Sequence, residues 1–277
     1  MDRAAELKFI ADLARSAGKV ALQYFGHVDR LTKTHSMTTD EAVTEGDRAT
    51  QRHIVAALRQ TFPGDNIIGE ENDTGSAITA EIGDPDGRTW VIDPIDGTNN
   101  YISGIGLFCV CIGLLDHGRP VLGVVYDVTR DIAYAGAEGH GAFANERPIA
   151  ALPTPMSNAS VLMLTSNLLD KAGRCPGWAV HWIGQTDWKV RMLGSAALEA
   201  VHVAAGLAHG AVTVNGKLWD CVAPAAIVFA AGGLVTDLNG GQIFPYDLRN
   251  YTGAKVPFLA AGQQSHAELL AEMQKHP

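Results

Sequence analysis

The chain has 277 residues, with 30 Asp and Glu against 21 Lys and Arg, and a formal net charge of −9 at neutral pH. Its 47% hydrophobic and 18% charged residues indicate a folded globular protein, because disordered chains contain fewer apolar residues and more charge. The acidic balance argues against direct nucleic-acid binding, which depends on Lys and Arg contacts to phosphate. The excess acids either spread over the surface, where they aid solubility, or gather at a cation-binding site.

The N-terminal stretch carries charges throughout and lacks the apolar segment of a signal peptide. The longest weakly polar runs, residues 107–115 and 223–235, are too short to span a bilayer and contain Gly. We therefore expect a soluble, cytoplasmic protein that does not use a membrane as a partner.

The first half of the chain alternates helical and strand-like patterns. Residues 4–25 and 47–60 have apolar residues at helical spacing, and Thr44-Glu45-Gly46-Asp47 is a helix-capping pattern before the second helix. Residues 90–92 indicate a short buried strand that ends in acids. The β-rich segments 107–115, 121–126 and 132–135 are separated by turn residues and predict an antiparallel meander.

A Pro-containing segment, residues 149–158, is the best candidate for a linker between two halves. Beyond it we predict strands near 161–164, 211–214, 234–238 and 257–260. Helices are predicted after Gly194 with Ser195 as cap, after Asp220 with Pro224 in the first turn, and from Ser265 onward. Without a regular βαβ rhythm, a layered α/β or α+β architecture is favoured over a barrel or a doubly wound sheet.

The densest group of chemically useful residues is Asp93-Pro94-Ile95-Asp96-Gly97-Thr98, which follows the strand at 90–92. Carboxylate and carbonyl oxygens are the ligands that hard divalent cations prefer, so Asp93, Asp96 and the Ile95 carbonyl could hold a metal ion. Free backbone amides at Gly97 and Thr98, at a predicted helix start, favour an anion. The alternative is a solvated Asx turn that caps a helix and binds nothing. The motif alone leaves both interpretations open.

Three further sites place acids at the ends of predicted elements. Glu70 and Glu71 follow the apolar residues 67–69, while Asp47 and Asp220 lie at predicted helix starts. Taken singly, each acid is adequately explained as a helix cap or a surface charge.

Together, these motifs resemble the inositol monophosphatase family of magnesium-dependent, lithium-sensitive phosphatases. The resemblance runs from the first helix to about residue 262, and its two aspartate motifs are highly specific in order and spacing. The matching segments are Val43-Thr44-x-x-Asp47, Gly69-Glu70-Glu71, Asp93-Pro94-Ile95-Asp96-Gly97-Thr98-x-Asn100, Gly123-Val124-Val125-Tyr126, Gly139-x-Gly141-Ala142-Phe143, and Trp219-Asp220-x-x-Ala223 followed by Ala231-Gly232-Gly233.

This resemblance implies an alternating α-β-α-β-α sandwich of the sugar-phosphatase type. It implies one catalytic domain over residues 1–277, with subdomains 1–150 and 151–277 as a further division. It also implies a homodimer and a small phosphomonoester as substrate.

The site residues implied by the resemblance surround two or three Mg²⁺ ions. Glu70, Asp93 and the Ile95 carbonyl would hold the first ion, and Asp93, Asp96 and Asp220 the second, with Asp93 bridging them. Many family members bind a third, weaker ion through Glu70 and water. The expected catalytic residues are Asp47, Glu70 and Thr98. The expected substrate contacts are Gly97, Thr98, Arg191, Gly194, Ser195, Ala196, Thr213 and Asp220.

The substrate is the least determined part of this prediction. Thr213 stands where inositol-specific relatives have an acidic residue, and Lys217 lies nearby. A small polyol or sugar phosphate similar to inositol 1-phosphate is expected. Histidinol phosphate, fructose 1,6-bisphosphate and adenosine 3′,5′-bisphosphate remain alternatives. A function of another class, as a regulatory protein-binding subunit of a transcription complex, also remains open.

Overall fold

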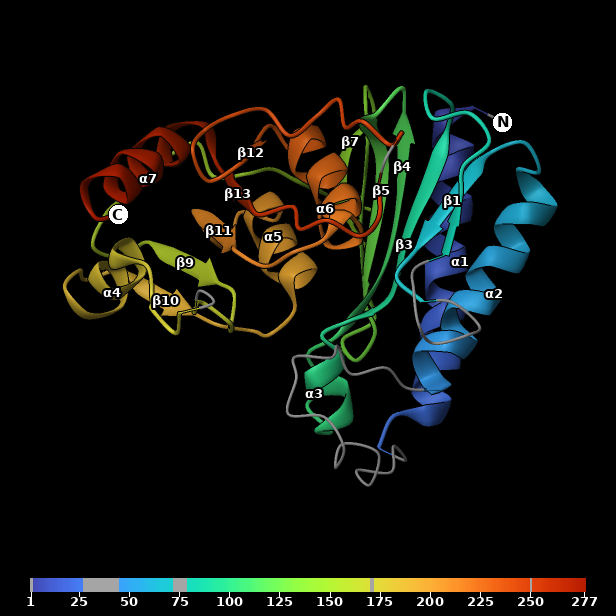
Figure 1. Cartoon of the computed structure of the whole chain (residues 1–277), viewed down its shortest axis with the longest axis horizontal. Coiled ribbons are helices and arrows are strands. Elements are labelled where there is room, and N and C mark those ends of the chain that lie inside the picture. The colour runs from blue at the N-terminus through green and yellow to red at the C-terminus, as the bar shows by residue number, and fades with distance from the viewer. Residues whose placement is uncertain (1, 27–44, 72–78, 170–171, 250) are drawn as a thin grey trace.

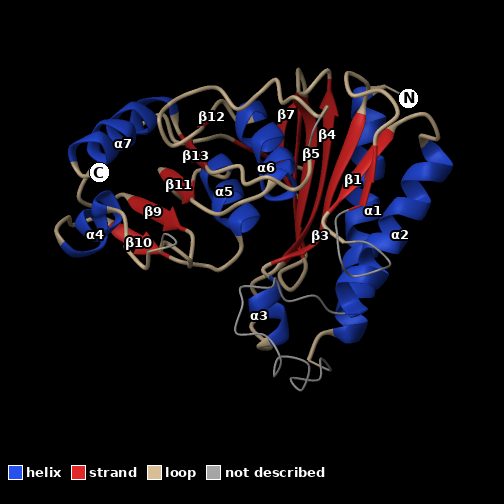
Figure 2. Ribbon diagram, in the orientation of Figure 1, coloured by secondary structure: helices blue, strands red, loops and turns tan. Residues whose placement is uncertain are grey.

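The computed structural model describes residues 2–26, 45–71, 79–169, 172–249 and 251–277, which form five alternating layers of helix and sheet (Figure 1). Helices α1 (Arg3–Tyr24) and α2 (Glu45–Thr61) cover the outer face of an eight-stranded sheet. Helices α5 (Ala196–Ala204) and α6 (Leu218–Ala230) lie between this sheet and a five-stranded one. Helices α4 (Gly177–Gly184) and α7 (Gln263–Lys275) form the last layer (Figure 2). This arrangement confirms the predicted α-β-α-β-α sandwich.

The eight-stranded sheet has the order β2-β1-β3-β4-β5-β6-β7-β8. Only β1 and β3 pair in parallel, and the other neighbours are antiparallel. The predicted meander is confirmed by the antiparallel pairs β4/β5 and β5/β6. The strands are β1 (Asn66–Gly69), β2 (Thr79–Glu81), β3 (Thr89–Asp96), β4 (Cys109–Asp116), β5 (Arg119–Asp127), β6 (Ile132–Ala137), β7 (Gly141–Ala144) and β8 (Arg147–Ile149).

The five-stranded sheet has the order β10-β9-β11-β13-β12. The predicted linker at 149–158 begins at Ile149, which is the last residue of β8, and ends before Val161, where β9 begins. It therefore connects the two sheets. The division into subdomains stays a prediction. The strands are β9 (Val161–Leu164), β10 (Lys189–Arg191), β11 (Gly210–Thr213), β12 (Leu234–Thr236) and β13 (Phe258–Ala261).

Helices α1 and α2 form where the apolar spacing predicts them. Ile10, Ala14 and Ala17 of α1 and Ile54 and Leu58 of α2 are fully buried and pack in one core cluster with the strands. Thr44, the predicted cap of α2, lies outside the described residues. No described helix has both the length and the apolarity needed to cross a membrane.

Helix α6 differs from its prediction. It begins at Leu218, before Asp220, and therefore contains Pro224 in its interior rather than in its first turn. An interior Pro removes one helical hydrogen bond and costs about 3 kcal/mol or more. Burial of nearly every side chain of α6 between the two sheets outweighs that cost. The sequence pattern could not register this burial, because it comes from residues distant in the chain.

The contact between α6 and the eight-stranded sheet requires a strand residue without a side chain. A Cβ atom added at Gly123 of β5 would lie 2.1 Å from the Ala223 carbonyl oxygen of α6. Backbone atoms on both sides leave no flexible group to move aside, so α6 packs directly on β5 only because this position is Gly.

Gly123→Ala is therefore expected to destabilise the protein by about 1–3 kcal/mol or more, the range for overpacked cores. Urea unfolding of the variant against the wild type measures this loss. Gly64→Ala is the control, since a Cβ there meets nothing within 4 Å. Equal stability of the Gly123 and Gly64 variants would contradict the close packing of α6.

Candidate active site

The two aspartates of the central motif lie on one strand with an irregularity between them. Asp93 of β3 pairs with Cys111 of β4 and Asp96 pairs with Cys109, and the strand register shifts between the two pairs. In a regular strand, side chains separated by two residues point to opposite faces of the sheet. The register shift between Asp93 and Asp96 allows both carboxylates to point to the same side. The strand extends through Asp96 and is longer than the predicted 90–92, because Pro94 lies in this irregular stretch, where no ladder hydrogen bond is required.

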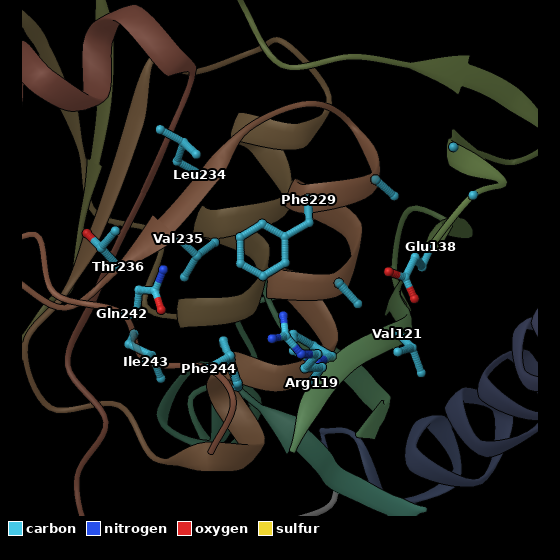
Figure 3. A pocket seen from close by; sticks show the side chains of 15 residues that line it. Arg119, Val121, Glu138, Phe229, Leu234, Val235, Thr236, Gln242, Ile243 and Phe244 are labelled. Atoms are coloured by element: carbon cyan, nitrogen blue, oxygen red, sulfur yellow. The ribbon is translucent and has the colours of Figure 1, made fainter. Parts of the chain in front are cut away.

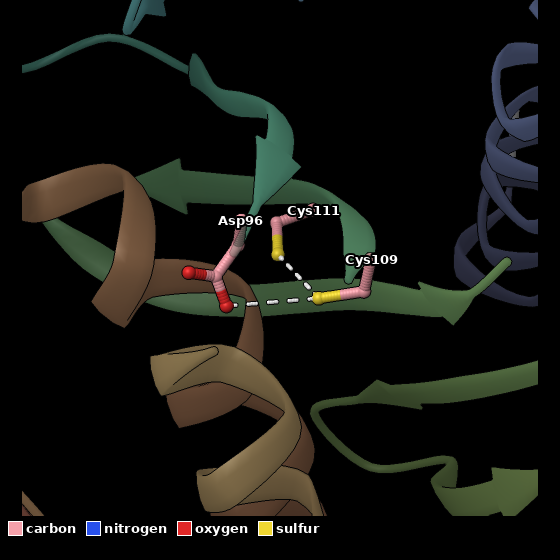
Figure 4. Close-up of side chains that lie close together, drawn as sticks. All are labelled: Asp96, Cys109 and Cys111. Carbon is pink, nitrogen blue, oxygen red and sulfur yellow. Dashed lines mark hydrogen bonds between the residues drawn. The ribbon is translucent and has the colours of Figure 1, made fainter. Parts of the chain in front are cut away.

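Asp96 is held by groups from two elements, the start of α5 with its cap and the strand β4. Its Oδ2 accepts hydrogen bonds from the Ser195 hydroxyl at 2.5 Å and the Ala197 amide at 2.7 Å, and Cys109 Sγ lies 3.7 Å away (Figure 4). Cys111 Sγ packs 3.7 Å from Cys109 Sγ, as expected for two cysteines on one face of a buried strand. These contacts, with a further hydrogen bond from the Ala196 amide, orient the Asp96 carboxylate at the site.

Glu70 and Asp47 approach this strand from neighbouring elements. Glu70 follows β1, which pairs in parallel with β3, and its side chain forms a hydrogen bond with Asp93. Asp47 is buried in the first turn of α2 and lies close enough to Glu70 for its charge to raise the pKa of that carboxyl. Parallel pairing thus brings the ends of two acid-bearing strands to one edge of the sheet.

Asp220 completes the group from the middle layer. It lies in the first turn of α6, where its Oδ2 accepts a hydrogen bond from the Lys217 amide at 2.6 Å. Carboxylate oxygens of Asp93, Asp96 and Asp220 lie within 4.8 Å of one another. The structure therefore brings together all five acids that the sequence analysis selected.

The electrostatics of the group are unfavourable without cations. Burial, followed by the negative charge of Asp220, raises the pKa of Glu70 well above its ordinary value. Burial, followed by the charge of Glu70, does the same to the pKa of Asp93. Burial raises the pKa of Asp96 too, although the Ser195 hydroxyl and nearby amides oppose that shift. Ionising all of these groups in one place requires compensating positive charge.

Divalent cations fit this donor set. The oxygens come from carboxylates and from the Ile95 carbonyl, which already accepts a hydrogen bond from Thr98 Oγ1 at 3.0 Å and retains a second lone pair. Asp93 forms a hydrogen bond with Glu70 and shares a cluster of carboxylate oxygens with Asp96 and Asp220, so it would be a ligand common to both halves of this acid group. The residues present therefore match a site for hard cations.

Gly97 and Thr98 form the side of the site expected to bind phosphate. Gly97 has a φ of +97° and caps the short helix α3 (Thr98–Ile102). A Cβ atom there would meet the Leu107 carbonyl oxygen at 2.8 Å, so both the conformation and the space require Gly. Thr98 and Asn99 line a pocket of about 220 Å³ together with Glu70, Asp96 and Asp220.

The predicted substrate residues divide into two groups. Gly194, Ser195, Ala196 and Thr213 line a second pocket, of about 150 Å³, which shares Asp96 and Asp220 with the first. Ser195 caps α5 as predicted, by accepting a hydrogen bond from the Leu198 amide. Arg191 lies at the end of the short strand β10, is exposed, and lines neither pocket.

The sequence analysis did not identify several residues that line the second pocket. Thr165 and Ser166 follow β9, and Asn215 follows β11, so all three come from the ends of strands in the second sheet. Glu199 of α5 is 1% exposed, and its Oε1 accepts hydrogen bonds from the amides of Leu193 and Gly194 at 2.8 and 3.2 Å. An acid inside an otherwise apolar helix pattern was the signal that could have identified Glu199.

A larger cavity of about 660 Å³ lies elsewhere, between α6, β5 and the segment that follows β12 (Figure 3). Most of its lining is apolar, with Phe229, Val235 and Phe244 among the side chains shown. Arg119 and Glu138 are its charged residues, and none of the five site acids lines it. Volume alone therefore does not identify the reactive site of this protein.

The sequence matches the inositol monophosphatase family over residues 2–277. It is 35% identical over 245 residues to a fructose-1,6-bisphosphatase/inositol-1-monophosphatase of Thermotoga maritima, covering 87% of each chain. It is 34% identical over 234 residues to the Nus factor SuhB of Pasteurella multocida, covering 83% of this chain and 84% of the relative. It is 35% identical over 239 residues to a histidinol-phosphatase of Chlorobaculum parvum, covering 86% and 87%.

The fold matches the solved structure of a Thermotoga maritima IMPase with a TM-score of 0.81 and 32% sequence identity, covering 98% of this chain and 97% of the other. The match along the whole chain, together with the five converging acids, supports the resemblance read from the motifs. The chain belongs to the inositol monophosphatase family and is a phosphoric monoester hydrolase.

Proposed function

We propose that this protein is a Mg²⁺-dependent phosphatase of a small polyol or sugar phosphate similar to inositol 1-phosphate. The observation that carries the proposal is the convergence of buried and partly buried carboxylates beside a pocket with neutral hydrogen-bonding side chains. Sugar and polyol hydroxyls both donate and accept hydrogen bonds, which the hydroxyls and amide of this pocket can match. The residues are Thr165, Ser166, Thr213 and Asn215.

The metal ions would be held by Glu70, Asp93, the Ile95 carbonyl, Asp96 and Asp220. When bound, Mg²⁺ supplies positive charge that offsets the phosphate dianion and lowers the pKa of water. The chain itself would contribute Asp47 and Thr98, which would orient the attacking water and accept its proton. The amides of Gly97 and Thr98 would bind phosphate oxygens, and Gly194, Ser195 and Ala196 would border the organic part of the substrate.

A sugar bisphosphate is the second candidate, favoured by the position of Lys217. This residue lines the same pocket as Glu70 and Asp220. Its ammonium donates one hydrogen bond to the Gly253 carbonyl at 2.6 Å and lies over the Trp219 ring, 5.8 Å from its centroid. An ammonium carries three donors, so donors remain for a second phosphate group.

A phosphate-release panel tests the proposal and separates the two candidates. We expect the highest kcat/KM for inositol 1-phosphate or another polyol monophosphate, with activity dependent on Mg²⁺ and inhibited by millimolar Li⁺. Fructose 1,6-bisphosphate, histidinol phosphate and adenosine 3′,5′-bisphosphate are the comparison substrates. Metal-independent activity, or a clear preference for histidinol phosphate, would contradict the proposal.

Lys217→Gln distinguishes the second candidate. If Lys217 binds a second phosphate, the variant should lose about 10-fold or more in kcat/KM for the bisphosphate, as expected for one charge-assisted contact, and little for the monophosphate. Lys189→Gln, at an exposed residue of β10, is the matched control. Equal losses on both substrates would assign Lys217 a structural role.

A further inference from the structure

A second group of metal-binding side chains lies where α4 meets α7, in the layer farthest from the eight-stranded sheet (Figure 1). His181 belongs to α4, and Glu272 and His276 are four residues apart at the end of α7. The Gly177 amide, at the start of α4, donates a hydrogen bond to the Pro277 carbonyl at 3.2 Å. This backbone contact fixes the end of α7 against α4 and brings the three side chains together.

Two imidazoles face one carboxylate oxygen in this group. The Nε2 atoms of His181 and His276 lie 3.7 and 3.8 Å from the same oxygen, Oε2 of Glu272. The rings are stacked, with centroids 3.9 Å apart and planes inclined by 21°. Lys275 binds the other oxygen, Oε1, at 2.6 Å, so Oε2 is the one turned to the imidazoles.

These distances suit ligands of one ion better than hydrogen-bond partners. A hydrogen bond between nitrogen and oxygen spans about 2.7–3.2 Å, which is shorter than either contact. Ligands bound to a tetrahedral Zn²⁺ at about 2.0–2.1 Å lie roughly 3.3–3.4 Å from one another. The three atoms lie within 4.8 Å of each other. To bind one ion, each nitrogen–oxygen contact must shorten by a few tenths of an ångström. The two stacked rings must also rotate so that both Nε2 lone pairs point to the same ion. Both changes are side-chain rotations of residues that are 21–37% exposed.

The outer contacts of His181 also match those of a metal ligand. Its Nδ1 lies 3.1 Å from the Gln185 side-chain oxygen, one turn further along the chain. An amide oxygen can only accept, so this contact places the proton on Nδ1 and leaves the Nε2 lone pair directed at Glu272. Metal-binding histidines characteristically donate a hydrogen bond from the N–H of their second ring nitrogen, which fixes the tautomer and the ring orientation.

We propose that His181, Glu272 and His276 form a binding site for Zn²⁺ or a similar borderline divalent transition metal, with water completing the coordination. Two imidazoles and one carboxylate are a donor set that Zn²⁺ favours, whereas Mg²⁺ and Ca²⁺ favour oxygen alone. The site is separate from the carboxylate group of the active site and independent of the substrate. An ion bound there joins α4 to α7 and thereby stabilises the outer layer of the five-stranded sheet.

The test is Zn²⁺ binding to the full-length protein by equilibrium dialysis with excess Mg²⁺ present. The Asp93→Asn background weakens binding at the active-site carboxylates and isolates the second site. We expect this variant to retain one Zn²⁺ and to gain thermal stability when Zn²⁺ is added. Adding His276→Gln should weaken the affinity by roughly 100-fold or more, since loss of an outer partner alone costs about 10–100-fold.

Two further variants test whether Zn²⁺ binding depends on the group formed by His181, Glu272 and His276. Gln185→Ala, which removes the partner of His181 Nδ1, should weaken Zn²⁺ binding by about 10-fold. His117→Gln, at an exposed histidine beside Asp116, should leave it unchanged. The proposal is overturned if the Asp93→Asn protein binds no Zn²⁺, or if His276→Gln binds Zn²⁺ as tightly as its parent.

Discussion

Asp93→Asn should lower Mg²⁺-dependent phosphate release by about 10³-fold or more, and Asp220→Asn should do the same. The metal charge stabilises the transition state by several kcal/mol, and each 1.4 kcal/mol corresponds to a factor of ten in rate. Asp93 is next to Glu70, Asp96 and Asp220 and would serve both ions, and Asp220 is the acid of the five that α6 contributes. Steady-state phosphate release over a Mg²⁺ titration measures the loss.

The loss of activity should occur without loss of stability. Asn retains a carbonyl oxygen that can accept the hydrogen bond from the Ile95 amide to Asp93, 3.0 Å in the wild type, or from the Lys217 amide to Asp220. Removing one charge also relieves repulsion among buried carboxylates, so the metal-free variants should melt at the wild-type temperature or above it. Asp12→Asn, at an exposed residue of α1, is the activity control. Full activity in the Asp93 and Asp220 variants would refute the assigned site.

In the wild type, the free energy of unfolding should decrease as the pH rises, because of Glu199. Glu199→Gln should abolish this pH dependence. Burial raises the pKa of Glu199 from 4.5 to about 8, although hydrogen bonds from the Leu193 and Gly194 amides oppose the shift. Between these two pH values the folded protein holds a proton that the unfolded chain has released. The free energy of unfolding therefore falls as the pH rises from about 4.5 to about 8 and then levels off.

The size of this effect is on the order of a few kcal/mol, at about 1.4 kcal/mol per pKa unit. Gln retains an oxygen that can accept from Leu193 and Gly194 and carries no charge at any pH. Urea unfolding should give similar stabilities for variant and wild type near pH 4.5, and a more stable variant near pH 8.5. Glu138→Gln, at an exposed residue, should show no such divergence. A constant difference across this range would contradict a neutral buried Glu199.

Elements with a strong local pattern were predictable from the sequence. Helix α1 and the meander of β4, β5 and β6 depend on apolar spacing and turn residues that lie within the same segment. The strand β10 and the helix α4 were missed, because β10 is three residues long and α4 carries little polar contrast around its axis. The start of α6 was placed too late, because its interior Pro is tolerated only through burial between two sheets.

The same distinction applies to the site. The sequence by itself singled out the acids expected to carry the chemistry, since Asp93, Asp96, Asp47, Glu70 and Asp220 occur in motifs whose order and spacing are specific. Only the tertiary structure decided how they are arranged: the parallel pairing of β1 with β3 brings Glu70 to Asp93, and the packing of α6 on the sheet adds Asp220. The tertiary structure also decided that Glu199 is buried beside the active-site pocket. In the outer layer, it decided that His181 contacts Glu272 and His276. Burial and proximity are properties of the assembled layers, because they depend on side chains contributed by distant segments, and no local pattern encodes them.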